Sequence, residues 1–250
     1  MATLTNRTAL VTGASRGLGA GIATALARAG ASVAVNYVHS EAKANSLCDA
    51  LASEGARAQA FRADIRDEAD VQRLMREVES AFGPIDIVVA NATGDQQRMS
   101  IEEQNWQAYL QQMEFFVKSP LLLMQAVLPQ WKARKFGRFI QIGSEVVELG
   151  NPKFAHYVAA KGAQLAQTRS WARELGPDGI TVNLIAPGWI PTERAFNATA
   201  EDRTNYLAGV PLPQSGTPQN IGDAVVFLAS DAGSFITGQK LAVNGGNTLE

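Results

Sequence analysis

The chain alternates between short runs rich in β-branched residues and longer segments in which apolar side chains recur with helical spacing. The short runs predict about seven strands, at Thr8–Val11, Ser32–Asn36, Arg57–Arg62, Ile85–Ala90, Arg138–Ile142, Ile180–Ile185 and Lys240–Val243. The longer segments predict helices near residues 17–29, 40–54, 67–82, 102–131, 155–175 and 218–230. This alternation predicts an α/β fold, a single-domain Rossmann-type doubly wound parallel sheet with helices on both faces.

One segment, at about residues 190–214, departs from this rhythm. It follows a predicted strand but contains Pro, Thr, Asn and scattered aromatic residues before the run Pro211-Leu-Pro-Gln-Ser-Gly216. We expect a partly helical flap that covers the substrate. The sequence has no internal repeat or linker, so residues 1–250 are predicted to form one dinucleotide-binding catalytic domain.

Composition narrows the class of protein further. The 250 residues are 46% hydrophobic and 18% charged, enough to bury one core of this size. A net charge of −2 leaves no basic excess for a nucleic-acid backbone, so nucleic acid is not an expected partner. The sequence shows neither a signal peptide nor an apolar run of membrane-spanning length, which predicts a cytoplasmic protein without a membrane partner. Cys48 is expected to be a small buried side chain, and no metal site is predicted.

A glycine-rich turn follows the first predicted strand. Its glycines would let the backbone approach a pyrophosphate at the N-terminus of a helix, although a tight turn without a ligand is the alternative. The spacing differs from the G-x-G-x-x-G pattern, but the physical role is similar. The predicted cofactor-binding residues in this turn are Gly13, Ser15, Arg16, Gly17, Leu18 and Gly19.

The end of the second strand bears on the choice of cofactor. A carboxylate there would bind the ribose hydroxyls of NAD, but this chain has Asn36-Tyr-Val-His-Ser40. Arg16 is expected to pair with a 2′-phosphate, with Asn36 and Ser40 as donors. The pattern therefore favours NADP(H) over NAD(H). A solvated surface arginine is the alternative for Arg16.

Two further strand ends carry polar residues. Asp64 and Ile65 follow the third strand and are expected to hold the adenine edge of the cofactor, although Asp64 could equally be a helix cap. Asn91 follows the fourth strand, where small neighbours would allow the cofactor ribose to lie close.

Tyr157, Lys161 and Ser144 form the candidate catalytic group. Residues four apart project from one face of a helix, so the ammonium of Lys161 would stand beside the phenol of Tyr157. That arrangement lowers the pKa of the phenol from about 10 toward the working pH, so Tyr157 can exchange a proton with an alkoxide. Ser144 would polarise a carbonyl. Each residue alone could be incidental, but together with the glycine-rich turn they indicate a dehydrogenase or reductase of a small carbonyl or alcohol.

These motifs resemble the short-chain dehydrogenase/reductase family over essentially the whole chain. The motifs are Thr12–Gly19, Asn91, Ser144, Tyr157, Lys161 and Pro187-Gly188. The resemblance is nearest to the 3-oxoacyl-acyl-carrier-protein reductase branch, through Val35–Tyr37, Gly179–Asn183 and Gly238–Gly246. It implies hydride transfer from nicotinamide C4, a grip of Lys161 on the nicotinamide ribose and a homotetramer. It also implies that Pro187, Gly188, Ile190 and Thr192 contact the cofactor.

The chain departs from the family pattern in two places. Ala90-Asn-Ala-Thr93 replaces the usual Asn-Asn-Ala-Gly, and the helix after the fourth strand lacks the expected asparagine. Counting forward from Trp106 places that position at Met113, whereas counting back from Lys118-Ser-Pro120 places it at Phe116. A bulge or kink is therefore expected within residues 111–116. As a hypothesis Glu114 substitutes for the asparagine; an exposed residue or one at a subunit contact is the alternative.

The side chains expected around the substrate are Glu145, Glu148, His156, Trp189 and Phe196. Glu145 would make the entrance acidic, which makes an acyl-carrier substrate less favoured without excluding it, and His156 is not expected to be catalytic. The leading interpretation is an NADP(H)-dependent ketoreductase. The alternatives are an NAD-dependent secondary-alcohol dehydrogenase and a cofactor-binding regulator with impaired catalysis.

Overall fold

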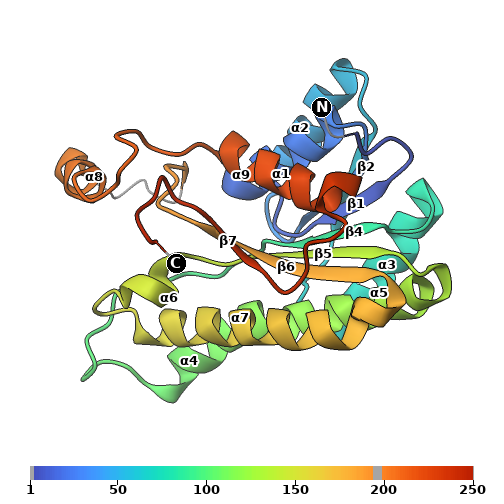
Figure 1. Ribbon diagram of the computed structural model, residues 1–250. Helices are drawn as coiled ribbons and strands as arrows, with labels where there is room; N and C mark the ends of the chain where they lie inside the picture. Colours follow the sequence, from blue (N-terminus) through green and yellow to red (C-terminus); the bar gives the residue numbers. More distant parts are fainter. Residues whose placement is uncertain (1–2, 194–198, 250) are drawn as a thin grey trace.

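The computed structural model describes residues 3–193 and 199–249, and its strands form one parallel sheet (Figure 1). The strand order is β3-β2-β1-β4-β5-β6-β7. Their bounds are β1 (Thr8–Val11), β2 (Ser32–Tyr37), β3 (Ala58–Arg62), β4 (Ile87–Ala90), β5 (Gly137–Ile142), β6 (Ile180–Pro187) and β7 (Lys240–Val243). The predicted doubly wound parallel sheet is confirmed, and the strands of its middle are buried on both faces.

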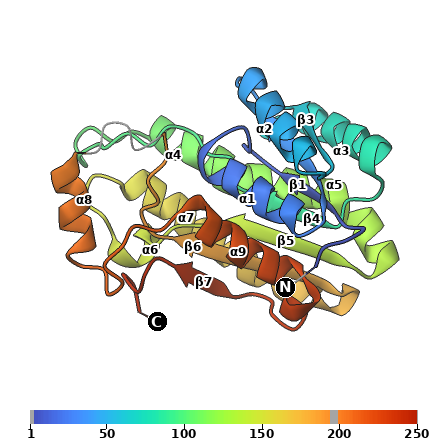
Figure 2. The ribbon, with the colours of Figure 1, turned by 90° about the horizontal axis from the view of Figure 1, so that it is seen from above.

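The helices cover the two faces in groups. Their bounds are α1 (Gly17–Arg28), α2 (Glu41–Ser53), α3 (Glu68–Phe82), α4 (Trp106–Met113), α5 (Ser119–Arg134), α6 (Val146–Leu149), α7 (Ala155–Leu175), α8 (Ala200–Leu207) and α9 (Pro218–Ala229), with short 3₁₀ turns at Gly176–Asp178 and Asp231–Gly233. Helices α1, α2 and α9 pack on one face and α3, α5 and α7 on the other (Figures 1 and 2). Successive residues of β1 alternate between these cores, since Ala9 and Val11 belong to the first and Leu10 to the second.

The single helix predicted for residues 102–131 is instead three pieces. It begins at α4, where the side chain of Asn105 accepts a hydrogen bond from the Ala108 N–H. A π-helix, η1 (Glu114–Lys118), then separates α4 from α5. Both the backbone N–H and the hydroxyl of Ser119 donate to the Glu114 carbonyl, five residues earlier. The predicted bulge or kink is thereby confirmed.

The carboxyl ends of β1, β4, β5 and β6 meet at one edge of the sheet, which also carries α6 and α8 (Figure 1). β6 runs two residues beyond its predicted end to Pro187, which pairs with Val243. The candidate residues follow these strand ends. No described helix has the length and apolarity needed to cross a membrane. Among the described residues, no three His, Cys, Asp or Glu side chains gather in a way that could hold a metal ion.

Candidate active site

The turn between β1 and α1 is shaped by glycines. Gly13 and Gly17 have φ values of +61° and +57°, in the left-handed region that favours glycine. A Cβ on Gly13 would lie 2.8 Å from the Cα of Ala92, and a Cβ on Gly19 would lie 2.5 Å from the carbonyl oxygen of Gly13. The turn therefore packs against the backbone after β4 and leaves the N-terminus of α1 bare of side chains, which suits the approach of a pyrophosphate.

Asn91 ties that turn to β4. Its side-chain amide donates to the carbonyls of Thr12 at 2.8 Å and Gly13 at 3.3 Å. The hydroxyl of Thr12 in turn accepts from the N–H groups of Asn91 at 2.9 Å and Ala92 at 3.0 Å. Thr12 was not singled out from the sequence, although it opens the glycine-rich motif. The amide of Asn91 thus holds the glycine-rich turn against the end of β4.

The structure contradicts the role predicted for Asn36. This side chain is 1% exposed and its Oδ1 accepts from the Gly13 N–H. Its amide nitrogen donates to the carbonyls of Ala63 at 3.0 Å and Phe61 at 3.4 Å, so both amide hydrogens are directed to the protein backbone. Asn36 joins β1 to β3 and has no donor left for a 2′-phosphate. Ser40 precedes α2 and is partly exposed, and its role stays a prediction.

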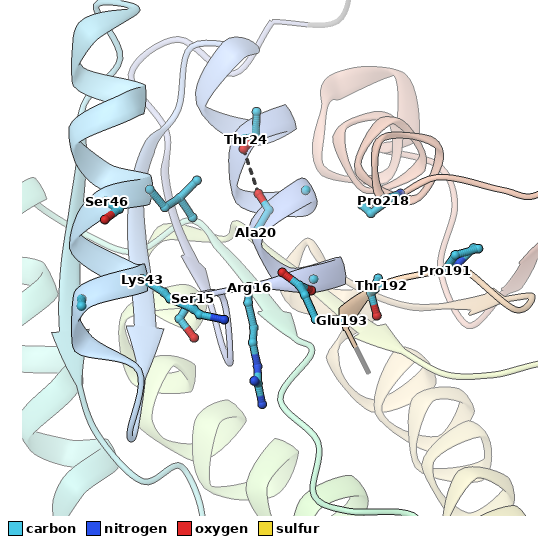
Figure 3. A pocket seen from close by; sticks show the side chains of 14 residues that line it. Ser15, Arg16, Ala20, Thr24, Lys43, Ser46, Pro191, Thr192, Glu193 and Pro218 are labelled. Carbon is cyan, nitrogen blue, oxygen red and sulfur yellow. Dashed lines mark hydrogen bonds between the residues drawn. The ribbon is translucent and has the colours of Figure 1, made fainter. Parts of the chain in front are cut away.

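An open cavity of about 730 Å³ lies beside the first turns of α1 (Figure 3). Arg16 on the turn and Lys43 on α2 both line it, together with Ser15 and Ser46. Neither Lys43 nor Ser46 was named from the sequence, although both lie on the helix that follows the decisive second strand. None of Asn91, Ser144, Tyr157 or Lys161 lines this cavity, so it reaches the phosphate end of the candidate site rather than the reacting end.

Asp64 forms an ion pair with Arg66, two residues further along the chain. The guanidinium of Arg66 donates to both carboxylate oxygens, at 3.0 and 2.7 Å, and this pairing lowers the pKa of Asp64 below its ordinary value. The alternative in which Asp64 caps a helix is wrong, because the cap of α3 is Asp67, which accepts from the Asp70 N–H. Ile65 is buried among the apolar side chains that pack against α3.

The segment after β6 returns to the N-terminus of α1. Gly188 donates its N–H to the Val243 carbonyl at 3.2 Å, and a Cβ on it would lie 2.5 Å from the Tyr206 hydroxyl. Ile190 packs against the apolar core shared by α1 and α9. Thr192 lines the cavity beside α1, where its Cβ lies 3.5 Å from the place of a Cβ on Gly17. Four predicted cofactor residues, Pro187, Gly188, Ile190 and Thr192, therefore stretch from the sheet to the glycine-rich turn.

Lys161 links the catalytic candidates to the sheet. The residue is 3% exposed and its ammonium donates to the Ile142 carbonyl at 2.6 Å, two residues before Ser144. The same nitrogen lies 5.8 Å from the ring centroid of Tyr157, as expected for residues one turn apart on α7. The Ser144 hydroxyl accepts from the Val146 N–H at 3.3 Å, which directs it at the start of α6. The end of β5 and the first turns of α7 thus bring the candidate groups to one edge of the sheet.

Two neighbours of Lys161 were assigned no role from the sequence, in which Phe116 was named only as one of two positions for the missing asparagine. The ring of Phe116, 2% exposed, has its centroid 3.7 Å from the ammonium, and Oε1 of the buried Gln164 accepts from it at 3.1 Å. The three-residue spacing of Lys161 and Gln164 on one helix was an available signal. Glu114 instead points away, with a side chain that is 46% exposed and 4.0 Å from Arg66. The hypothesis that Glu114 replaces the missing asparagine is therefore not supported by its position.

Glu145 was expected at the entrance of the site, and the structure corrects this. It is only 4% exposed, and its carboxylate accepts from the Tyr206 hydroxyl at 2.9 Å and from the Asn247 amide at 3.1 Å. Burial raises the pKa of Glu145, and the hydrogen bonds from Asn247 and Tyr206 partly offset that effect. The Glu148 carboxylate forms an ion pair with Lys240 on β7. Glu145 therefore does not make the entrance of the site acidic.

The other residues expected near the substrate lie around this edge. His156 is buried between the rings of Tyr109 and Phe154, and burial lowers its pKa. Trp189 donates its backbone N–H to the Tyr206 hydroxyl at 2.9 Å. Phe196 lies outside the described residues.

The chain is similar to known enzymes along nearly its full length. A family model described as enoyl-(acyl carrier protein) reductase matches residues 13–248. A 3-oxoacyl-[acyl-carrier-protein] reductase of Staphylococcus aureus is 39% identical over 242 residues, which are 96% of this chain and 97% of that protein. The 3-oxoacyl-[acyl-carrier-protein] reductase of Escherichia coli K12 is also 39% identical, over 95% of this chain and 96% of that protein.

Solved structures agree with this likeness. A blue fluorescent protein from a metagenomic library, crystallised in complex with NADPH, is 35% identical with a TM-score of 0.89 and covers 99% of this chain and 100% of its own. A dehydrogenase/reductase from Sinorhizobium meliloti 1021 is 34% identical with a TM-score of 0.90, over 99% of this chain and 97% of its own. The similarity includes every element that carries a candidate residue.

Proposed function

The chain belongs to the short-chain dehydrogenase/reductase family, and we propose on that premise that it reduces a ketone or 3-oxoacyl substrate to a secondary alcohol with NADP(H). One observation carries the proposal. The buried ammonium of Lys161 is anchored to the strand end that leads to Ser144 and stands one helical turn from Tyr157. A phenol, an ammonium and a hydroxyl at one edge of the sheet can supply the proton and the charge stabilisation for carbonyl reduction.

Each residue has a distinct role in the proposed reaction. A bound nicotinamide cofactor would supply the hydride to the carbonyl carbon. Tyr157 gives its phenolic proton to the forming alkoxide, and Lys161 favours the phenolate that remains. The Ser144 hydroxyl donates to the carbonyl oxygen and stabilises the charge that develops on it. The same groups work in reverse when an alcohol is oxidised.

The preference for NADP(H) rests on charge. Arg16 and Lys43 border one cavity beside the turn that would receive the phosphates, and both side chains are exposed to a ligand there. An arginine can bind a phosphate through two parallel hydrogen bonds, and a lysine adds a point charge. The relative crystallised with NADPH, 35% identical, supports a nicotinamide cofactor for this chain as well.

The proposed substrate class follows the relatives, which are named as 3-oxoacyl-[acyl-carrier-protein] reductases. An acidic entrance was the main argument against an acyl-carrier substrate. The carboxylate of Glu145 is turned inward to Tyr206 and Asn247, so that argument loses its basis. Residues 190–214 are the proposed flap over the substrate within one catalytic domain, and α8 with Tyr206 is its described anchor.

We also propose a homotetramer that works in the cytoplasm. The support is apolar surface on two parts of the molecule, with Trp106 at 67% exposure on α4, and Phe227 at 41% and Phe235 at 101% at and just after α9. The edge strand β7 contacts α9, which carries Phe227. Light scattering would give the mass of the assembly, and a monomer would contradict the proposal.

The reaction is tested by following NADPH and NADH oxidation with a panel of β-ketoesters, acetoacetyl thioesters, cyclic ketones and diketones. We expect turnover with NADPH, and a loss of 10²-fold or more in Tyr157→Phe with NADPH binding retained, a magnitude on the order of general acid catalysis. Cofactor binding without turnover across the panel would instead favour the regulator. Turnover that survives Tyr157→Phe would overturn the assignment of the proton donor.

A further inference from the structure

The ammonium of Lys161 sits among three fixed partners. It donates to the Ile142 carbonyl at 2.6 Å and to Gln164 Oε1 at 3.1 Å, and it lies 3.7 Å from the ring centroid of Phe116. All of the side chains concerned are buried. A lysine charge out of water is costly unless acceptors or an aromatic face stabilise it, so these partners decide whether the ammonium keeps its proton and its place.

A short polar chain ties the backbone of α7 at Gln164 to β5. The Gln164 backbone carbonyl accepts from the Thr168 hydroxyl at 3.0 Å, and that hydroxyl accepts from the Gln141 amide of β5 at 2.9 Å. Gln164 is 1% exposed, so its side chain has no solvent to turn toward. A lysine has donors only, so the amide must offer it the oxygen.

The π-helix sets the position of Phe116. The extra residue in its turn rotates the following side chains, so that Phe116 faces α7 and packs edge-on to Tyr157 with ring centroids 5.5 Å apart. The Gln167 amide of α7 donates to the Val117 carbonyl at 3.2 Å and holds the two helices together. A plain α-helix through this stretch would present a different residue to Lys161.

The other charged groups near this point are engaged elsewhere. Glu114 of the π-helix lies 4.0 Å from Arg66, and Glu145 after β5 is bonded to Tyr206 and Asn247. Lys161 itself is 3% exposed, and its ammonium nitrogen lies 5.8 Å from the ring centroid of Tyr157.

We propose that Gln164 and Phe116 are positioning residues for Lys161, which hold its ammonium charged beside Tyr157 and so set the pH range in which Tyr157 exchanges its proton. This inference rests on the proposed function, because it assigns Tyr157 and Lys161 to that reaction. Both act on Tyr157 through the ammonium, and Phe116 also packs against the Tyr157 ring. Loss of either would weaken the field that favours the phenolate.

The test is the pH profile of kcat/KM for alcohol oxidation, in which the acidic limb reports the ionisation of Tyr157. Gln164→Met keeps the length of the side chain but removes the oxygen. We expect the limb to move up by about one pH unit, so that kcat/KM at pH 7 falls about tenfold. Phe116→Leu keeps the apolar volume and should move the limb in the same direction by less. Gln125→Met, the same change at an exposed position of α5, should leave the limb in place.

The outcomes separate this inference from the proposed function. Turnover by the unaltered protein and its loss in Tyr157→Phe are measured first, and their failure would refute the reaction itself. If both hold and the limb is unmoved in folded Gln164→Met and Phe116→Leu, the positioning roles are overturned. Should Gln164→Met fail to fold, Gln164→Asn keeps the amide but draws its oxygen back from the ammonium by one methylene. An upward shift in that variant supports the inference, and an unmoved limb overturns it.

Discussion

The hydroxyl of Tyr206 donates a hydrogen bond of 2.9 Å to the buried carboxylate of Glu145, which directly follows Ser144. The same hydroxyl accepts from the Trp189 N–H, and the second carboxylate oxygen accepts from Asn247 near the end of the chain. One carboxylate therefore joins the loop after β5, helix α8 and the C-terminal segment. The proposed flap is fastened to the loop that carries the proposed catalytic serine.

Tyr206→Phe should loosen this junction. The change leaves an oxygen of Glu145 and the N–H of Trp189 without their partner, which costs about 1–3 kcal/mol in the free energy of unfolding. Thermal unfolding measures the loss. Tyr109→Phe is the matched control, because that hydroxyl donates to the side chain of the partly exposed Gln104 and the loss of this bond should cost less. Equal effects of the two changes would contradict the junction.

Glu145→Gln should change how stability depends on pH. Burial raises the folded-state pKa of Glu145 above its ordinary value of 4.5, so the unfolded chain releases this proton first as pH rises. The free energy of unfolding contributed by Glu145 is therefore complete below pH 4.5 and declines as pH rises through the raised pKa. Urea unfolding from pH 4 to pH 8 should show this decline in the unaltered protein and its absence in Glu145→Gln. Parallel curves would rule it out.

Asn36→Ala should lower stability without altering the choice of cofactor. It removes hydrogen bonds to Gly13, Phe61 and Ala63, for an expected loss of about 2–4 kcal/mol in the free energy of unfolding. The KM values for NADPH and NADH should rise together, since the turn at Gly13 serves both. Asn45→Ala, an exposed site on α2, is the control. A selective loss of NADPH binding would restore the role first predicted for Asn36.

Glu114→Ala should retain full turnover. The carboxylate is about half exposed and its described partner is Arg66, 4.0 Å away, so its removal disturbs only a surface ion pair. Steady-state kinetics with the best substrate of the panel checks this. A marked fall in kcat with unchanged thermal stability would return Glu114 to the proton pathway.

The sequence predicted the strands well because strand patterns are local. β1 and β7 have the predicted bounds, and the other strands differ by one or two residues at an end. Buried parallel strands are continuous apolar runs flanked by turns, so their positions need no knowledge of distant contacts. The glycine-rich turn was equally visible, because its backbone geometry demands glycine at fixed positions.

The missed features depend on distant partners. Glu145 finds Tyr206 and Asn247, which are 61 and 102 positions further along the chain, so its burial could not be read from its neighbours. The side-chain amide of Asn36 is likewise engaged by distant partners, since it accepts from the Gly13 N–H and donates to the Ala63 carbonyl after β3. The sequence did indicate the π-helix, because counting from its two sides placed the missing asparagine at two different residues. The position of Phe116 beside Lys161, however, depends on how the π-helix packs against α7.

The choice of cofactor gives a final prediction, carried by Arg16 and Lys43. Both line the cavity at the phosphate end of the site, from the turn before α1 and from α2 (Figure 3). NADPH differs from NADH only by the 2′-phosphate, so a residue that binds this group affects one cofactor alone. A hydrogen bond between charged groups contributes about 1.5–3 kcal/mol, which corresponds to roughly 10- to 100-fold in KM.

Arg16→Ala and Lys43→Ala should therefore each raise the KM for NADPH, Arg16→Ala by more because a guanidinium binds phosphate through two bonds. The KM for NADH should stay within about twofold in both. Added salt should narrow the difference, since exposed charges are screened. Arg28→Ala is the control, because Arg28 lies at the far end of α1 and is bonded to Glu54. If both cofactors weaken equally, the two cations hold the shared pyrophosphate, and the preference for NADPH must come from another part of the site.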